Sequence, residues 1–215
     1  MLSRIEAAAR TEVIVKPTTA GEELQIGDYW TYVSRDRITS RIKATVTHAV
    51  TDVTPSEIGI RVTMPRKPPA FLLCDRSWNM IDDGVWRYMP HNGMGIKAPI
   101  IVGNTWPIKA TYFHNEKDAC WRRSGTTNVL ARRTVTTKAG AFDTFEIVSV
   151  FCDEKSNDPT RKIQAVQRMW YAPAISRWVK RTHEIRMQER NILRKSMDEL
   201  IGYSCRGQIA NRKRS

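Results

Sequence analysis

Hydrophobic and polar residues alternate with a period of two along most of the chain, which is typical of strands with one buried face. Residues 42–50 place Ile42, Ala44, Val46, His48 and Val50 on one face. Residues 58–64 repeat the pattern after a Thr-Pro-Ser turn, so the two segments predict a hairpin. Further strands are predicted at residues 71–81, 85–89, 106–114, 121–137, 142–152, 163–171, 177–187 and 193–205.

Breaks in the alternation predict the connections. Asp-Asp-Gly at residues 82–84 and Lys-Ala-Gly at residues 138–140 are tight-turn signals. Residues 90–99 are rich in Gly and Pro and predict a long, mobile loop. The polar run at residues 153–161 predicts another loop, and residues 186–194 predict a wide turn or an irregular stretch.

About ten strands joined mainly by short turns predict an all-β fold. We expect a single curved antiparallel sheet that forms a half-barrel or barrel, in preference to two packed layers, with residues 90–99 covering its open edge or mouth. The β domain is expected to span residues 24–206. Residues 1–23 are expected to form an N-terminal arm with a short helix at 3–10 and a linker at 16–21, and residues 207–215 a basic tail.

The formal net charge of +13 favours anionic partners: nucleic acid, lipid headgroups, acidic polysaccharide or an acidic protein. Basic residues are spread through the whole chain, however, as on the wet face of a sheet. A basic surface is predicted at Arg122, Arg123, Lys180 and Arg181. Because Trp121 and Trp178 lie beside these residues, the pattern partly fits a nucleic-acid interface. We rank this interpretation below binding of a lipid or a protein partner.

The sequence leaves the cellular location of the protein open. No stretch approaches the roughly 20 apolar residues of a membrane-spanning helix, and the first ten residues hold no apolar core of a signal peptide. The protein is expected to be periplasmic or in the cell envelope if a signal was removed, and cytoplasmic otherwise. Four widely spaced cysteines argue against a zinc site, and they predict either buried thiols or disulfides in one of three pairings.

No catalytic motif is present. The sequence lacks a nucleophile elbow, a phosphate-binding P-loop and a dinucleotide fingerprint. Its four histidines are far apart, and His48 is expected to be a hydrogen-bonded core residue. We therefore predict a protein that is not an enzyme and that carries no metal or cofactor.

Four segments resemble a known family. They are Val-Gly-Asn-Thr-Trp at residues 102–106, the hairpin at 134–147, Trp-Tyr-Ala-Pro at 170–173 with its continuation to 180, and Glu-Leu-Ile-Gly-Tyr at 199–203. In that order they resemble the TapB-like cell-envelope domains of unknown function, whose half-barrel is similar in outline to periplasmic lipoprotein carriers. The resemblance implies a curved sheet and an envelope location, and it implies no catalytic residues. Where the family has a glycine, this chain has Ser176.

Seven tryptophans are the richest feature of the composition. Trp78, Trp86 and Trp106 flank residues 90–99 and are predicted to line a hollow for a lipid or another amphiphile. The leading hypothesis is thus an envelope protein that binds such a ligand, or a partner protein, on a curved sheet. The alternatives are a scaffolding protein with a filled core and a basic face for an acidic partner, and a basic nucleic-acid-binding module.

Overall fold

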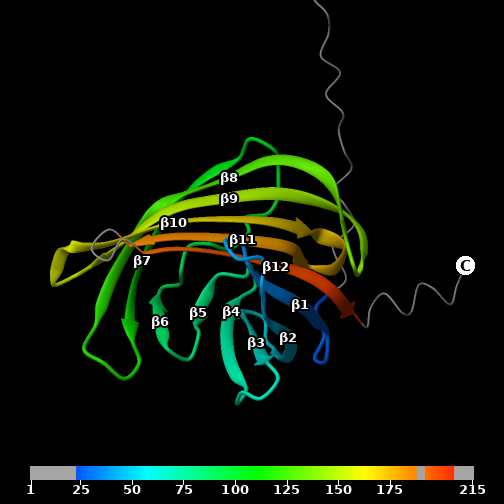
Figure 1. Cartoon of the computed structure of the whole chain (residues 1–215), viewed down its shortest axis with the longest axis horizontal. Coiled ribbons are helices and arrows are strands. Elements are labelled where there is room, and N and C mark those ends of the chain that lie inside the picture. Colours follow the sequence, from blue (N-terminus) through cyan, green and yellow to red (C-terminus); the bar gives the residue numbers. More distant parts are fainter. Residues whose placement is uncertain (1–22, 188–191, 206–215) are drawn as a thin grey trace, which may run out of the picture.

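The computed structural model describes residues 23–187 and 192–205, which form a closed barrel of antiparallel strands (Figure 1). Each strand pairs with its neighbours in sequence, and the first pairs with the last. The elements are β1 (Tyr29–Asp36), β2 (Ile42–Val53), β3 (Glu57–Thr63), β4 (Ala70–Asp75), β5 (Met80–Asp82), β6 (Trp86–Met89), β7 (Thr105–His114), β8 (Cys120–Thr137), β9 (Gly140–Lys155), β10 (Asp158–Ala172), the 3₁₀ helix η1 (Pro173–Ile175), β11 (Arg177–Met187) and β12 (Ile192–Ser204).

The all-β, antiparallel prediction is confirmed, and the sheet is a barrel rather than a half-barrel. Pairing of β1 with β12, from Tyr29 opposite Ser204 to Asp36 opposite Ser196, closes it and leaves no open edge for a loop to cover. The helix predicted at residues 3–10, the linker at 16–21 and the basic tail at 207–215 lie outside the described residues, as do residues 188–191 of the predicted irregular stretch.

The meander gives the barrel two different ends. The turns after β1, β3, β5, β7 and β9 lie at one end, which we call the mouth. The turns after β2, β4 and β8 lie at the other end together with η1, and we call this end the base.

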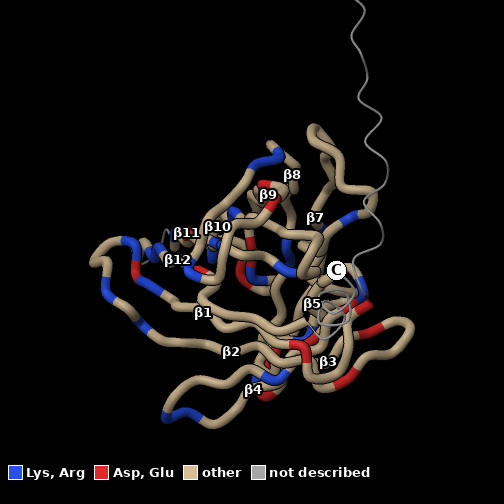
Figure 2. The backbone as a smooth tube through the Cα atoms, turned by 90° about the vertical axis from the view of Figure 1, so that its right-hand side faces the viewer, with Lys and Arg blue, Asp and Glu red and all other residues tan. Residues whose placement is uncertain are grey.

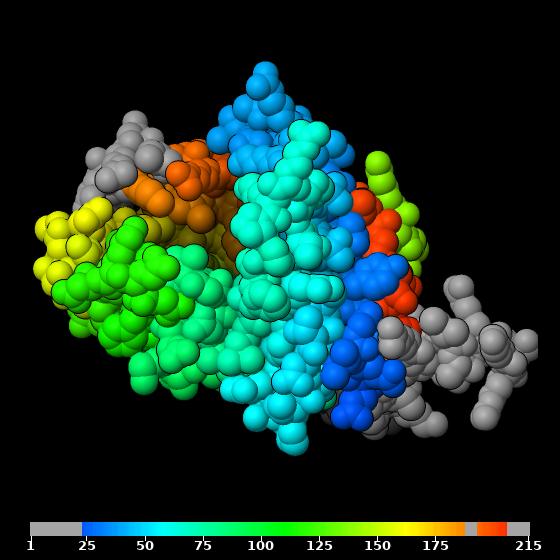
Figure 3. Space-filling view, turned by 90° about the horizontal axis from the view of Figure 1, so that it is seen from below, coloured from blue at the N-terminus to red at the C-terminus, as the bar shows by residue number. Residues whose placement is uncertain are grey.

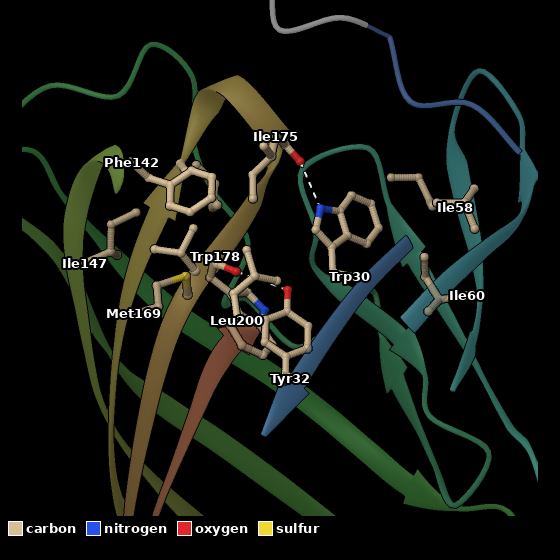
Figure 4. Packing of buried hydrophobic residues seen from close by; sticks show 14 of the residues in the cluster. Trp30, Tyr32, Ile58, Ile60, Phe142, Ile147, Met169, Ile175, Trp178 and Leu200 are labelled. Atoms are coloured by element: carbon tan, nitrogen blue, oxygen red, sulfur yellow. Dashed lines mark hydrogen bonds between the residues drawn. The ribbon is translucent and has the colours of Figure 1, made fainter. Parts of the chain in front are cut away.

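The apolar core fills the interior toward the base (Figure 4). The Trp30 indole is fully buried and donates a hydrogen bond of 3.2 Å from Nε1 to the carbonyl oxygen of Ile175. Around it pack aliphatic and aromatic side chains from strands on all sides of the barrel: Ile58, Ile60, Trp106, Phe142, Ile147, Met169, Val179 and Leu200. This half of the barrel is therefore packed with the protein's own side chains.

One predicted strand is two strands. Residues 71–81 divide into β4 and β5 because Asp75 builds a turn between them. Its Oδ1 accepts hydrogen bonds from the backbone N–H groups of Ser77 (2.9 Å) and Asn79 (2.8 Å). Trp78 in this turn has a left-handed φ of 65°. A carboxylate that binds nearby backbone amides ends a strand in the same way as a glycine turn does.

The loop predicted at residues 90–99 packs into the barrel instead of lying mobile over an edge. Met94 and Ile96 are buried, and Met94 packs against Ile108 and Phe151. The Gly95 N–H donates to Asn79 Oδ1 at 2.5 Å, and the Ile96 N–H donates to the Ser77 carbonyl at 2.7 Å. The apolar residues within the Gly- and Pro-rich segment therefore hold it in place.

The polar run predicted as a loop at residues 153–161 is mostly strand. β9 continues to Lys155 and β10 begins at Asp158, so only a tight turn separates them. Glu154 on this hairpin forms ion pairs with Arg122 (3.0 Å) and Lys162 (3.0 Å). Polar residues are compatible with a strand here because the pairs join neighbouring strands across the sheet.

Candidate functional site

Charged side chains gather inside the barrel next to the apolar core. We call Tyr32, His48, Arg123, Asp153, Arg177, Arg181, His183 and Asp198 the interior polar cluster. They come from β1, β2, β8, β9, β11 and β12, which the closed sheet brings together around one interior. The burial of ionisable groups there is the most unusual chemical feature of the described chain.

Arg177 is placed by the corner between β10 and β11. Pro173 begins η1, and Ser176 ends it in a left-handed conformation with φ of 48°. The chain reverses at that point, which is the conformation for which the resembled family has a glycine. β11 then starts with three consecutive buried residues, Arg177, Trp178 and Val179.

The Arg177 guanidinium is only 6% exposed and lies among rings. Its Cζ is 4.0 Å from the centroid of the Trp78 ring and 5.4 Å from that of Trp30. Its Nη2 lies 3.0 Å from His48 Nδ1, while its Nε has no hydrogen-bond partner. Among the described residues no carboxylate forms an ion pair with it, and burial lowers the pKa of Arg177 below its usual value.

His48 stays neutral beside this cation. Burial lowers the pKa of His48 well below its usual value, and the charges of Arg177 and Arg181 lower it further. The neutral ring can accept the hydrogen bond from Arg177 at Nδ1. The sequence-based prediction of a hydrogen-bonded core histidine is confirmed.

Tyr32 joins Arg177 to the rest of the cluster. Its ring stacks on Trp178 with centroids 3.8 Å apart, and its hydroxyl donates to the Trp178 carbonyl at 3.0 Å. Burial raises the pKa of Tyr32 above its usual value. The phenol is therefore a neutral donor that fixes the position of Trp178 (Figure 4).

The other two arginines of the cluster have carboxylate partners. Arg123 binds Asp153 through two hydrogen bonds of 2.7 and 2.9 Å. Arg181 lies over the Trp178 ring at 4.2 Å and binds Asp198 at 3.0 Å. The cluster thus holds three arginines and two aspartates, so its surplus positive charge lies at Arg177.

His183 lies within the field of the Arg181–Asp198 pair. Burial is the main cause that lowers the pKa of His183 to about 3, and the charge of Arg181 lowers it further. The ring is neutral at neutral pH. The carboxylates of the cluster are thus paired with arginines, and its two histidines are uncharged rings, each with one N–H donor and one nitrogen acceptor.

The three predicted ligand-lining tryptophans do not line one site. Trp106 belongs to the core and is 5% exposed. Trp78 packs edge-on against Trp30 and faces Arg177, so it borders the interior polar cluster. Trp86 lies in a separate aromatic group with Tyr112 and His114.

The four predicted basic-surface residues lie on two faces of the sheet. Arg123 and Arg181 belong to the interior polar cluster, while Arg122 pairs with the half-buried Glu154 and Lys180 lies over the Trp170 ring at 5.4 Å. Successive strand residues point to opposite faces. This rule alone separates Arg122 from Arg123 and Lys180 from Arg181.

The sequence reading missed Arg177, Asp153 and Asp198 as functional candidates. A signal for two other ionisable residues of the cluster, Arg123 and His183, was present in the sequence. Arg123 has the same strand parity as Val129, and His183 has the same parity as Arg181 and Val179. Charged or titratable residues at apolar-face positions indicate an interior polar site. No such signal marks Arg177, because the buried run at the start of β11 breaks the alternation.

The mouth is hollowed on one side. Figure 3 shows a depression between the cyan strands β3 and β4 and the orange strands β11 and β12. Within the cluster, the Arg181 and Asp198 side chains keep 28% and 15% of their surface exposed. The interior polar cluster is therefore in contact with solvent at these two residues.

The described ranges 23–187 and 192–205 contain neither a cluster of metal-binding side chains nor a membrane-spanning helix. They hold no group of three or more His, Cys, Asp or Glu side chains that could bind a metal ion. They also hold no helix that is both long and apolar enough to cross a membrane. All four cysteines fall within these ranges, and no disulfide joins them.

Comparison with known proteins gives similarity at the level of fold. No family model and no curated protein matches the chain. A presumed lipoprotein of Parabacteroides distasonis matches with a TM-score of 0.52 and 13% identity, over 84% of this chain and 96% of that one. A presumed exported protein of Bacteroides fragilis with a YmcC-like fold matches with a TM-score of 0.53 and 14% identity, over 84% of this chain and 97% of that one.

These two structural similarities can be compared with the resemblance to TapB-like domains that the sequence suggested. The fold is the one found in presumed lipoproteins and exported proteins, which agrees with the coarser part of that resemblance. They give no support to the TapB-like group itself. What this chain shares with these proteins is their fold, which is described as YmcC-like for the Bacteroides fragilis protein.

Proposed function

We propose that this chain is a non-enzymatic protein of the bacterial cell envelope that binds an anionic amphiphile at the interior polar cluster. The observation that carries the proposal is Arg177, a buried guanidinium without a carboxylate partner among the described residues. Burying an uncompensated charge is costly. An anionic headgroup would supply the missing counter-charge, and the Trp78 and Trp178 rings would contact the first part of its apolar chain.

The partly exposed pair Arg181–Asp198 supports this assignment, since the cluster reaches solvent at these two side chains. A headgroup that entered there would meet arginine first. The envelope location rests on the presumed exported and lipoprotein character of proteins with a similar fold. Both parts of the proposal can be tested separately.

The binding test uses a dibrominated fatty acid, because bromine quenches nearby indole fluorescence. We expect saturable quenching by the acid and at least tenfold weaker binding of its uncharged methyl ester. Arg177→Met should weaken binding of the acid by about tenfold or more, the usual effect of losing a charge-assisted hydrogen bond of ~1.5–3 kcal/mol. Arg132→Met, which removes an exposed arginine paired with Asp143, is the matched control and should bind normally.

Stability measurements separate a binding role from a structural one. Arg177→Met removes a buried charge that lacks a carboxylate partner, so urea unfolding should show little change or a gain. Arg123→Met leaves the buried Asp153 carboxylate without its ion-pair partner, and should cost about 3–5 kcal/mol. Acid and ester that quench equally, or an Arg177→Met protein that binds the acid normally, would refute the proposal.

A second candidate function has its own supporting observation. Because the half of the barrel near the base is packed with side chains, the chain can act as a scaffolding or interaction protein that needs no ligand. Organic extraction of the purified protein followed by mass spectrometry distinguishes the two. Co-purified lipid favours the first candidate, and a ligand-free protein that fails to bind the fatty acid favours the second.

A further inference from the structure

Two neighbouring turns at the mouth carry exposed cations. The β1–β2 turn holds Arg37 and Arg41, and the β3–β4 turn holds Arg66 and Lys67, all of them exposed. Figure 2 shows both turns projecting from the same side of the molecule with their Lys and Arg residues, and Figure 3 shows these two parts of the chain projecting together when seen from below. Excess positive charge is therefore concentrated on one side of the mouth.

Acidic residues do not balance this charge. Between residues 35 and 43 and between residues 64 and 71 the only carboxylate is that of Asp36. It is engaged by Lys43 at 2.8 Å and by the backbone N–H groups of Ile38 and Thr39. The four cations at the turn tips thus face solvent without acidic neighbours in their own turns.

The same two turns expose large apolar side chains. Ile38 and Ile42 are each 59% exposed on the β1–β2 turn, and Phe71 is 60% exposed where β4 leaves the β3–β4 turn. Single exposed hydrophobic residues are common and need no explanation. Here three of them project beside four cations, which is the composition of surfaces that lie on anionic bilayers.

The turns have a defined backbone. Ser40 and Arg66 adopt left-handed conformations with φ of 60° and 61°, and prolines at 65, 68 and 69 restrict the second turn. A preformed turn presents its tip without a large ordering cost on binding.

We infer that these two turns form a docking surface for the headgroup region of an anionic lipid bilayer. Arg37, Arg41, Arg66 and Lys67 would lie at the lipid phosphates, while Ile38, Ile42 and Phe71 enter the boundary of the acyl chains. Projecting tips suit a soft bilayer, whereas an acidic peptide needs a groove and single-stranded nucleic acid needs a row of stacking rings. The inference goes beyond the proposed function and does not require it, because these turns lie outside the interior polar cluster.

Vesicle co-sedimentation tests the inference on the full chain. We expect binding to vesicles of phosphatidylglycerol and phosphatidylcholine, little binding to pure phosphatidylcholine, and a decrease as salt is raised. Arg66→Gln with Lys67→Gln should weaken binding by roughly fivefold per charge removed. Ile38→Ser with Phe71→Ser should weaken it by about tenfold or more.

The base offers a matched control. Ile101 and Val102 are 53% and 48% exposed, and no Lys or Arg occurs between residues 98 and 106. Ile101→Ser with Val102→Ser removes comparable apolar surface there and should leave vesicle binding unchanged. All substituted residues are exposed, so the variants are expected to fold, and circular dichroism verifies this.

Three results would overturn the inference: equal binding to charged and uncharged vesicles, equal loss in the control variant, or binding to an acidic peptide or single-stranded DNA with none to vesicles. Fatty-acid quenching in the same variants keeps the two proposals separate. Loss of vesicle binding with normal quenching concerns this surface, whereas loss of quenching in Arg177→Met with normal vesicle binding concerns the interior polar cluster.

Discussion

At the scale of single residues, the interior of this barrel keeps two histidines neutral. His48 and His183 both lie among arginines, and burial lowers the pKa of each. A folded-state pKa below the unfolded value means that the unfolded chain binds more protons as the pH falls. These histidines therefore stabilise the fold at neutral pH and lose that contribution on acidification.

The pH dependence of stability should show this loss. Between the usual value of 6.5 and the folded value of about 3, each pH unit removes up to ~1.4 kcal/mol per histidine. We expect the free energy of urea unfolding to fall from pH 7 to pH 5, and His183→Gln to reduce that fall by roughly half. Carboxylates with lowered pKa values, such as Asp82 and Glu154, remain ionised in this range. An unchanged slope in the variant would contradict the assignment.

The sequence predicted the burial of single residues correctly where the alternation within one strand determines it. His48 falls on the apolar face of its own strand, and its burial follows from that alternation. Arg177 and His48 are in contact although 129 positions separate them in the chain. Such a contact depends on the register of several hairpins, and no local pattern encodes it.

At the scale of elements, β8 and β9 approach each other closely because β8 has a glycine, Gly125, at the point of contact. A Cβ atom on Gly125 would lie 2.2 Å from the Val150 carbonyl oxygen and 2.6 Å from Phe151 Cα. Both neighbours are backbone atoms and cannot turn aside as a side chain can. Glycine therefore allows the two longest strands to pack against each other at this point.

Two alanine substitutions test this cause. Gly125→Ala should destabilise the protein by about 1–3 kcal/mol, the usual range for forced overpacking. Gly202→Ala adds the same methyl group in β12 with nothing within 4 Å, and it should be neutral or slightly stabilising. Chemical denaturation measures both, and equal effects of the two changes would exclude the steric explanation.

Strands were predictable where buried and exposed positions alternate regularly, as in β3 and β7. Prediction failed where side chains rather than Gly or Pro make the turn, as Asp75 does between β4 and β5. It also failed at residues 90–99, whose buried Met94 and Ile96 fix a segment that composition alone assigns to a mobile loop. In both places contacts with distant residues outweigh local preference.

At the scale of the molecule, neighbouring strands of the barrel are paired over very different lengths. β8 and β9 pair along almost their whole length, whereas β5 and β6 share a single register pair, Asp82 opposite Arg87. We call this short β5–β6 pairing the β5–β6 seam. Asn92 stabilises it, because the Asn92 backbone N–H donates to the Met80 carbonyl and the Asn92 Oδ1 accepts from the Met80 N–H. The β5–β6 seam is therefore the place where the wall opens at the lowest cost.

Hydrogen exchange read by mass spectrometry should reveal the seam. Amides of β5 and β6 are expected to exchange well before those in the middle of β8 and β9. Asn92→Ala should accelerate exchange in β5 without changing β8, because it removes the side-chain acceptor for the Met80 N–H. Uniform exchange around the barrel would show that the seam is no weaker than the rest.

Pairing of the first strand with the last also constrains how the molecule is made. During synthesis β1 emerges long before β12. The backbone N–H and C=O groups of β1 that pair with β12 therefore stay unpaired until residues 192–204 have been produced. An unfinished chain thus exposes an edge on which other chains can pair, and late non-local contacts slow folding. A chain with this connectivity closes its barrel only after residues 192–204 have been synthesised.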